Sequence, residues 1–246
     1  DTYPYLAGST ILGMVALPGW VQAGGVDETL RRLAEPATRA RLHAEWFAGD
    51  LPYPLDQMHL AMIAHPGWRW AEGRTVADAA EEAHLSRGDF VIDVLLASGM
   101  AVWVVIFRAG DRTDEDVRAI LRHPAHMAGS DGIFCGGYPH PRGWGAFARY
   151  LGRHTRELGD YTWAEAITHL SGHAARRYRL TDRGMIRPGF AADIAVFDPH
   201  VIIDRSTYAL GRREAEGMAH VLVNGRLVLK DGEPTGETPG RALRRG

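Results

Sequence analysis

Two apolar runs in the first half of the chain have the pattern of buried β-strands. Residues 2–6 are aromatic and β-prone, and residues 100–107, with the sequence MAVWVVIF, form a continuous, largely β-branched stretch. A run that is apolar at nearly every position is typical of a strand buried on both faces, as in a parallel sheet. We therefore expect both segments to be interior strands of an α/β fold.

Helical periodicity fills the segment between these two runs. Residues 27–48 are expected to form a helix that Pro36 breaks into two pieces. Thr75 is expected to cap a second helix that continues through Leu85, and residues 89–98 have the apolar spacing of a third. The last two helices predict a compact helical unit.

The second half begins with a further helix and strand. Thr113 and Asp116 have the spacing of a capping box at the start of a helix, and a short strand is expected to end at Asp131. The order strand, helix, strand predicts a right-handed crossover unit. Two more helices are expected at residues 144–157 and 162–178, the second with a capping box of its own.

The pattern changes again after Arg183, where apolar and polar positions alternate. Asn224-Gly225 lies between two alternating runs, which is a strong signal for a two-residue β-hairpin. The tail is therefore predicted to be an antiparallel β module.

Composition and charge narrow the class of function. The chain has 246 residues, 46% of them hydrophobic, so it can bury a sizeable core. Its formal net charge is -2 with acidic and basic residues interleaved, which favours a small substrate and predicts no nucleic-acid partner and no membrane partner. No apolar run is long enough to cross a bilayer. Cys135 is the sole cysteine, so we expect a reducing, cytoplasmic location.

Candidate chemistry gathers in one stretch, HMAGSDGIFCGGYPHPRGWG. Asp131 is expected at the carboxyl end of a parallel strand, where α/β folds place catalytic groups, although a simple turn is the alternative interpretation. Gly136-Gly137 would permit close backbone approach to a ligand, and Arg142 offers a planar cation suited to a carboxylate. His140, between two prolines, is expected to shape a substrate pocket.

These motifs carry a family resemblance. AGSDG followed by HPR, together with DTYPYLAGST, DRGMIRPGFAADIAVFDP and VLVNGRLVLKDGEPTGETPGRALRR, resembles the carboxyl-terminal half of the N-acyl-D-amino-acid deacylases. These are D-aminoacylase-like members of the amidohydrolase superfamily. The similarity extends over essentially the whole chain, in order and with matching spacing.

The resemblance implies an α/β fold: the carboxyl-terminal part of a metal-dependent (β/α)8 barrel, plus strands of a small β-sandwich. The barrel part would occupy residues 1–182, with a lid-like helical insertion at about 24–99, and the sandwich strands residues 183–246. The opening strand would be the seventh of the barrel, and the strand that ends at Asp131 the eighth.

The resemblance also implies a site and an activity. Asp131 would be both a zinc ligand and the catalytic proton acceptor. Tyr3, Ser9 and Arg142 match substrate-binding positions, the last two at the substrate carboxylate. The implied enzyme is a zinc-dependent hydrolase that cleaves the amide bond of N-acyl-D-amino acids.

The sequence departs from the family in its metal ligands. It contains no His-x-His motif, and a catalytic zinc normally takes three protein ligands, so Asp131 alone does not suffice. We therefore expect this chain to be inactive alone and to be one half of the enzyme, completed by an amino-terminal chain or segment. The alternatives are the same fold acting on a cyclic amide or a D-peptide, or a non-catalytic binding or scaffold fragment.

Three other features are candidates for a functional role. Glu165, His169 and His173 share one face of a predicted helix and could hold a metal, but a solvated face is the simpler interpretation. His126 is expected to be a hydrogen-bonded structural histidine. Cys135 lacks an evident base and is not expected to be a nucleophile.

Overall fold

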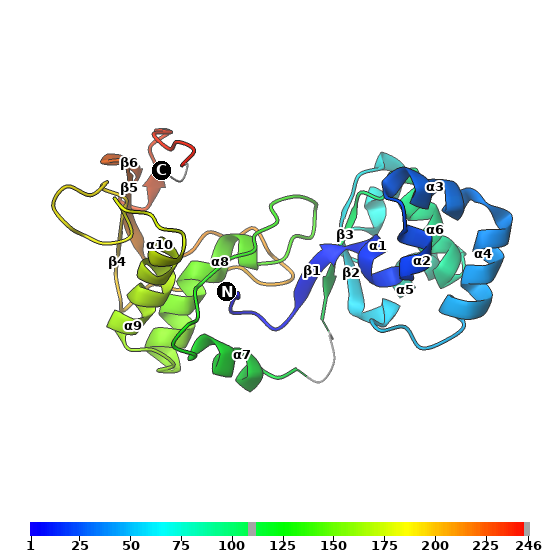
Figure 1. The fold of residues 1–246 in the computed structure, drawn as a ribbon, viewed down its shortest axis with the longest axis horizontal. Helices are drawn as coiled ribbons and strands as arrows, with labels where there is room; N and C mark the ends of the chain where they lie inside the picture. The colour runs from blue at the N-terminus through cyan, green and yellow to red at the C-terminus, as the bar shows by residue number, and fades with distance from the viewer. Residues whose placement is uncertain (108–111, 244–246) are drawn as a thin grey trace.

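The computed structural model describes residues 1–107 and 112–243, which form two lobes (Figure 1). The first, the helical lobe, contains β1 to β3 and the helices α1 to α6. The second lobe contains α7 to α10 and the strands β4 to β7. The amino terminus lies in the second lobe, so the chain enters the helical lobe and returns from it.

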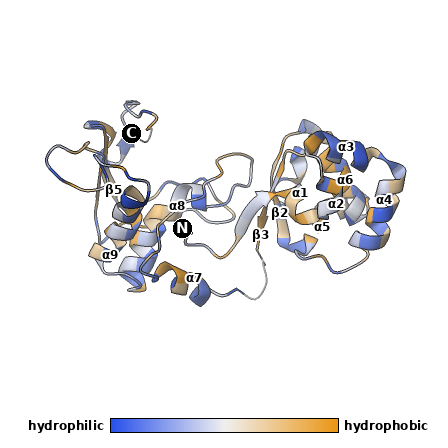
Figure 2. Cartoon of the chain, viewed as in Figure 1, coloured by the Kyte–Doolittle hydropathy of each residue, from blue (hydrophilic) through white to orange (hydrophobic). Residues whose placement is uncertain are grey.

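The helical lobe follows the predicted helices closely. Pro36 is the first residue of α4 and separates it from α3, and the Thr75 side chain caps α5 by accepting from the amide of Asp78. Hydrophilic residues line α3 and α4 at the outer edge of the lobe (Figure 2). The elements are β1 (Gly8–Ile11), α1 (Leu12–Ala16), α2 (Gly19–Gln22), α3 (Val26–Ala34), α4 (Pro36–Leu42), the π-helix η1 (His43–Phe47), the 3-10 helix η2 (Leu55–Gln57), β2 (Met58–Ile63), the 3-10 helix η3 (Pro66–Ala71), α5 (Val76–Glu82), α6 (Arg87–Ala97) and β3 (Val102–Ile106).

The strand predicted from MAVWVVIF is present as β3, but the prediction of a parallel sheet was wrong. β3 is the middle strand of a three-stranded sheet and runs antiparallel to both β1 and β2. Val104 belongs to the core of the helical lobe, whereas Val105 packs on the other face with Ala7 and Ala61, beside Tyr138 and Tyr208. The strand is therefore buried on both faces because each face has its own cover, which gives the same sequence pattern as a parallel strand.

The two short strands expected near the site are reduced to a single bridge. Thr2 pairs with Ala128 in the parallel direction, through the bonds Thr2 N to Met127 O at 3.4 Å and Gly129 N to Thr2 O at 2.9 Å. No described strand after α7 runs parallel to β3, so the predicted right-handed crossover unit was wrong. The described residues contain two antiparallel sheets and no closed barrel.

Two helices of the second lobe, α7 and α9, begin where their capping residues predict, whereas α8 begins at Arg142, before the predicted start at residue 144, and has no side-chain cap. Thr113 with Asp116, and Thr162 with Glu165, each form a complete capping box. The elements are α7 (Asp114–Leu121), α8 (Arg142–Arg149), the π-helix η4 (Tyr150–Glu157), α9 (Trp163–Ile167), the π-helix η5 (Thr168–Gly172) and α10 (His173–Arg177).

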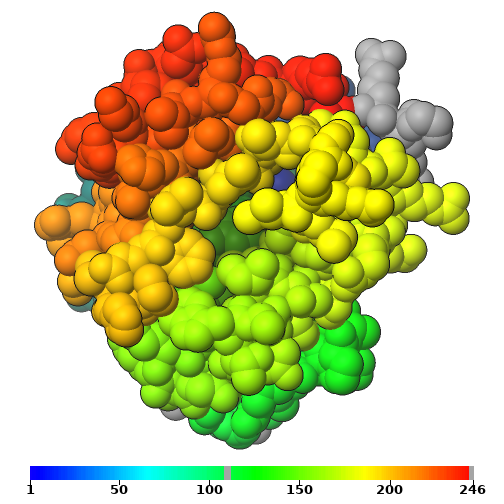
Figure 3. All heavy atoms as spheres, turned by 90° about the vertical axis from the view of Figure 1, so that its left-hand side faces the viewer, coloured from blue at the N-terminus to red at the C-terminus, as the bar shows by residue number. Residues whose placement is uncertain are grey.

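The predicted antiparallel tail is present as a four-stranded sheet in the order β4-β5-β6-β7. Its strands are β4 (Ile194–Phe197), β5 (Met218–Val223), β6 (Arg226–Lys230) and β7 (Glu233–Pro234). Asn224 and Gly225 form the hairpin turn with φ of 47° and 77°. No residue in these strands is buried. Figure 3 shows this sheet above the helices of the second lobe, with residues near 180–192 in yellow crossing between them.

Candidate active site

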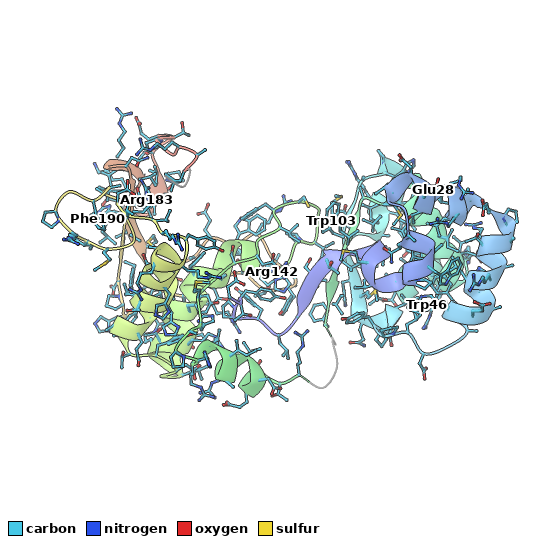
Figure 4. The ribbon with its side chains drawn as sticks, in the orientation of Figure 1. Glu28, Trp46, Trp103, Arg142, Arg183 and Phe190 are labelled. Atoms are coloured by element: carbon cyan, nitrogen blue, oxygen red, sulfur yellow. The ribbon has the colours of Figure 1, made fainter. Side chains whose placement is uncertain are left out.

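The site is organised around the side chain of Arg142, the first residue of α8. This side chain is only 1% exposed, and it lies between the two lobes (Figure 4). Its Nη2 is 2.7 Å from Oδ2 of Asp131 and donates to the carbonyl oxygen of Ser9 at 3.3 Å, while its Nε donates to the carbonyl oxygen of Asp131 at 2.8 Å. The ring of Tyr3 lies 4.4 Å from the guanidinium carbon. The structure thus brings Tyr3, Ser9, Asp131 and Arg142 together.

His140 holds Arg142 from the backbone side. Its Nδ1 accepts from the amide of Arg142 at 3.0 Å, and its Nε2 lies 2.9 Å from the carbonyl oxygen of Ala7, to which it donates in the neutral form. Burial, aided by the charge of Arg142, lowers the pKa of His140 to about 3. The ring meets Tyr3 and Tyr5 edge to face. His140 is therefore neutral and buried within an aromatic cluster, where it binds the backbone amide of Arg142.

Asp131 is the exposed member of the group. Its side chain is 68% exposed, and its φ of 46° lies in the left-handed region, which aspartate tolerates better than most residues. Its carboxylate pairs with Arg142 on one side and faces solvent on the other. A carboxylate so placed can accept a proton from a small molecule or contribute one ligand to a cation.

The glycines that follow Asp131 have a different use from the one predicted. Gly136 has φ of 85°, and a Cβ there would overlap the carbonyl oxygen of Ala61. The amide of Gly137 donates to Oε2 of Glu72 at 2.6 Å. Both glycines therefore permit close approach to the backbone and side chains of the helical lobe, whereas the sequence pattern predicted close approach to a ligand.

Glu72 and Tyr138 were missed by sequence reasoning. Tyr138 donates its amide to the carbonyl oxygen of Ala61 at 3.1 Å, and its ring stacks on that of His59. Glu72 lies 65 residues from Gly137 along the chain. No local motif marks either contact, because both depend on how the helical lobe meets the loop.

The described residues do not by themselves fit a metal site. No group of three His, Cys, Asp or Glu side chains in residues 1–107 and 112–243 is arranged to hold a metal ion. A catalytic zinc needs about three protein ligands, and the cluster around Arg142 offers only Asp131. A zinc site that includes Asp131 would need ligands from outside this set.

The alternative trio of Glu165, His169 and His173 is not a metal site, and it is not a solvated face. Glu165 is engaged in the capping box of α9, and His173 Nδ1 lies 2.9 Å from the carbonyl oxygen of His126. His169 is buried, with its Nδ1 3.2 Å from Nδ1 of His126. His126 also lies 3.3 Å from the hydroxyl of Tyr161, so it is a hydrogen-bonded structural histidine, as predicted.

Comparison with known proteins decides the family. The sequence pattern of the Amidohydrolase family matches residues 84–229, which is more than half of the chain. This chain belongs to the amidohydrolase family. An N-acyl-D-aspartate deacylase from Alcaligenes xylosoxydans xylosoxydans is 34% identical over 239 residues, which cover 92% of this amidohydrolase chain and 45% of that protein. A D-aminoacylase from the same organism is 35% identical over 173 residues, or 70% of this chain and 34% of that one.

Solved structures give the same relationship. A crystal structure of D-aminoacylase matches 100% of this chain and 42% of its own, with a TM-score of 0.74 and 30% identity. The N-acyl-D-glutamate deacylase of Bordetella bronchiseptica, solved with zinc and a phosphonate inhibitor, matches 94% and 40%, with a TM-score of 0.67 and 28% identity. The chain is thus related to the D-aminoacylases, which confirms the predicted family, and it spans less than half the length of these relatives.

No helix in the described part of the chain combines the length and hydropathy needed to cross a bilayer.

Proposed function

We propose that this amidohydrolase chain is the carboxyl-terminal part of an enzyme that hydrolyses the amide bond of N-acyl-D-amino acids. The observation that carries the proposal is the convergence of Tyr3, Ser9 and Asp131 on the buried guanidinium of Arg142. These residues come from the two segments that the single parallel bridge joins. The relationship to the N-acyl-D-amino-acid deacylases gives that cluster its substrate class.

Arg142 is suited to bind the substrate carboxylate. A guanidinium withdrawn from water forms strong charge-assisted bonds to a carboxylate, and here the carboxylate of Asp131 occupies one such position. The substrate would replace it, so the buried charge stays paired throughout. Because Asp131 is mostly exposed, its carboxylate would turn into solvent or toward the scissile bond and not into packed core.

Asp131 would then act as the proton acceptor. Its carboxylate takes a proton from the attacking water and passes it to the departing amine, the usual role of a positioned general base and acid. Tyr3 and His140 would keep Arg142 in place during this exchange, through the ring face and the amide contact.

In this proposal, zinc binding requires ligands from barrel strands that this chain does not contain. Related structures hold zinc or a binuclear metal centre, whereas the described residues of this chain supply too few ligands. We infer that an amino-terminal chain or segment brings the other ligands and barrel strands one to six, with Asp131 as this chain's metal ligand. The parallel bridge between Thr2 and Ala128 has the direction expected of neighbouring barrel strands and supports this arrangement.

The test compares native material with the isolated chain. Intact mass spectrometry and metal analysis of the native protein should reveal additional amino-terminal sequence and zinc. The native protein should release D-amino acids from N-acetyl-D-amino acids faster than it releases L-amino acids from the L-enantiomers. The isolated chain should hydrolyse neither enantiomer. Stoichiometric zinc and full activity in the isolated chain would exclude the need for completion. A completed sample without D-selective hydrolysis would refute the substrate class.

A further inference from the structure

The loop between Asp131 and Arg142 is bound by the helical lobe and also by Arg212, whose Nη2 donates to the carbonyl oxygen of Gly136. Every residue from 131 to 141 is described, and none lies in a helix or strand. The middle of the loop is held by the bond from Tyr138 N to Ala61 O at 3.1 Å and by that from Gly137 N to Oε2 of Glu72 at 2.6 Å. Such a loop takes its shape from the surface that binds it.

Glu72 joins this loop to the sheet of the helical lobe. It follows η3, and its second oxygen, Oε1, accepts from the amide of Ile63 at 2.8 Å, at the end of β2. One carboxylate therefore bridges two backbone amides that belong to different lobes. Hydrogen bonds to an ionised acceptor are stronger than those between neutral groups.

The fit around this carboxylate leaves no room for a larger residue. A Cβ on Gly137 would lie 2.5 Å from Oε2 of Glu72, and a Cβ on Gly136 would lie 2.0 Å from the carbonyl oxygen of Ala61. Beside them, the rings of Tyr138 and His59 stack with centroids 5.6 Å apart. The loop and the helical lobe therefore pack closely against each other around the Glu72 carboxylate.

The two ends of the loop are held unequally. Arg142 has its own anchors, since His140 accepts from its amide and Tyr3 covers its guanidinium. The carboxylate of Asp131 is exposed and has Arg142 as its charge partner. The bond from Arg142 Nε to the carbonyl oxygen of Asp131 at 2.8 Å holds the Asp131 backbone but not its exposed carboxylate, so loss of the lobe contact should displace that carboxylate more than the guanidinium of Arg142.

We propose that Glu72 is a positioning residue, which fixes the loop and so sets the place of the Asp131 carboxylate relative to Arg142. The helical lobe is then a structural part of the active site. The kinetic consequence rests on the proposed function, whereas the structural consequence can be measured in the chain itself.

The first experiment is amide hydrogen exchange on the full chain, with Glu72→Gln and Glu72→Ala. In the glutamine variant one acceptor oxygen becomes an amide nitrogen, which cannot accept from a backbone amide. The amides of Gly137 and Tyr138, which the helical lobe binds, should exchange at least about tenfold faster in both variants, because a charge-assisted bond that holds this part of the loop is lost. Glu45→Gln, which removes an exposed carboxylate paired with Arg41 in the same lobe, is the matched control and should change nothing in this loop. Unchanged exchange in the loop, or an equal effect of Glu45→Gln, would overturn the proposal.

The second experiment uses the completed enzyme with an N-acyl-D-amino acid. Glu72→Gln should lower kcat by about tenfold and leave KM within about threefold, because Asp131 is displaced while Arg142 keeps its anchors. A loosened loop with normal kcat would overturn the positioning role. If the wild-type enzyme does not act on this substrate class, the proposed function fails, and hydrogen exchange alone then decides the structural role of Glu72.

Discussion

The carboxylate of Asp131 and the guanidinium of Arg142 lie 2.7 Å apart, one 68% exposed and the other 1% exposed. The pair is therefore asymmetric, with a cation withdrawn from water and an anion at the surface. A buried guanidinium needs an anionic partner at every stage, whether Asp131 or a substrate carboxylate in its place, whereas an exposed carboxylate can leave without a large desolvation cost. In the proposed enzyme, this asymmetry would make Arg142 the fixed binding group and Asp131 the group that acts on the substrate.

Replacing Arg142 by lysine should act mainly on KM. Lysine keeps the charge but loses the planar fork that contacts both Asp131 and Ser9, so KM for N-acyl-D-amino acids should rise by at least about tenfold. A carboxylate-free amide of the same substrate should be poor with the wild type and lose little further. Arg153→Lys, at an exposed pair with Asp114, is the control. Equal damage with both substrates would contradict the assignment of Arg142 to the carboxylate.

Replacing Asp131 by asparagine should act mainly on kcat. Asparagine also tolerates φ of 46°, has the same shape and keeps a side-chain oxygen that can accept from Arg142, so the fold should persist with some loss of stability while the proton acceptor is lost. Loss of a general base typically costs about 10²–10⁴ in rate, so kcat should fall within this range with little change in KM.

The control for this change is Asp231→Asn. Asp231 also has left-handed φ, 50°, and an exposed side chain, but it lies in the β module. Normal turnover in Asp131→Asn, or equal loss in both variants, would remove Asp131 from the mechanism.

Local signals predicted the starts of helices but not the arrangement of strands. Thr75, Thr113 and Thr162 each cap a helix through atoms a few residues away, so sequence alone locates them. The direction of β3 was mistaken because apolar residues record burial and not the identity of the covering element. The run of apolar residues in β3 is the same whether strands, helices or loops pack against the two faces of the strand.

The candidate site likewise has one part that the sequence predicts and one part that it does not. The motifs around Asp131 and Arg142 singled out the residues that the structure brings together, because the family resemblance links segments that no periodicity connects. Glu72 was not found, since its partner Gly137 is distant in sequence and the contact is made through a backbone amide. In the sequence, the one sign of this contact is a glycine, and glycines occur for many other reasons.

Stability should fall as the pH falls below about 6.5, the ordinary pKa of histidine. Burial lowers the pKa of His140 to about 3 and that of His126 to about 4, so the unfolded chain binds more protons than the folded chain between those values and 6.5. The stabilising contribution of the two neutral imidazoles is complete above pH 6.5 and is lost toward pH 4 for His126 and toward pH 3 for His140. Each histidine can contribute a slope of up to about 1.4 kcal/mol per pH unit.

Urea unfolding between pH 7 and pH 4.5 measures this slope. Replacing His126, whose buried Nε2 has no hydrogen-bond partner among the described residues, by glutamine should reduce the slope without touching the Arg142 cluster. A free energy of unfolding that is constant over this range would show that neither imidazole stays neutral in the folded chain.

The β module should make the isolated chain prone to self-association. β4 is an edge strand with Val196 42% exposed, and its neighbour β5, although rich in apolar residues, has no buried residue. An exposed apolar edge pairs readily with other chains unless further strands cover it, as the proposed amino-terminal part would do. Light scattering should therefore show aggregates of the isolated chain and none of the completed protein. Val196→Lys, which places a charge on the edge, should reduce aggregation, whereas Val26→Lys, at an exposed position in α3, should not. A monodisperse wild-type monomer at high concentration would contradict the need for a covering partner.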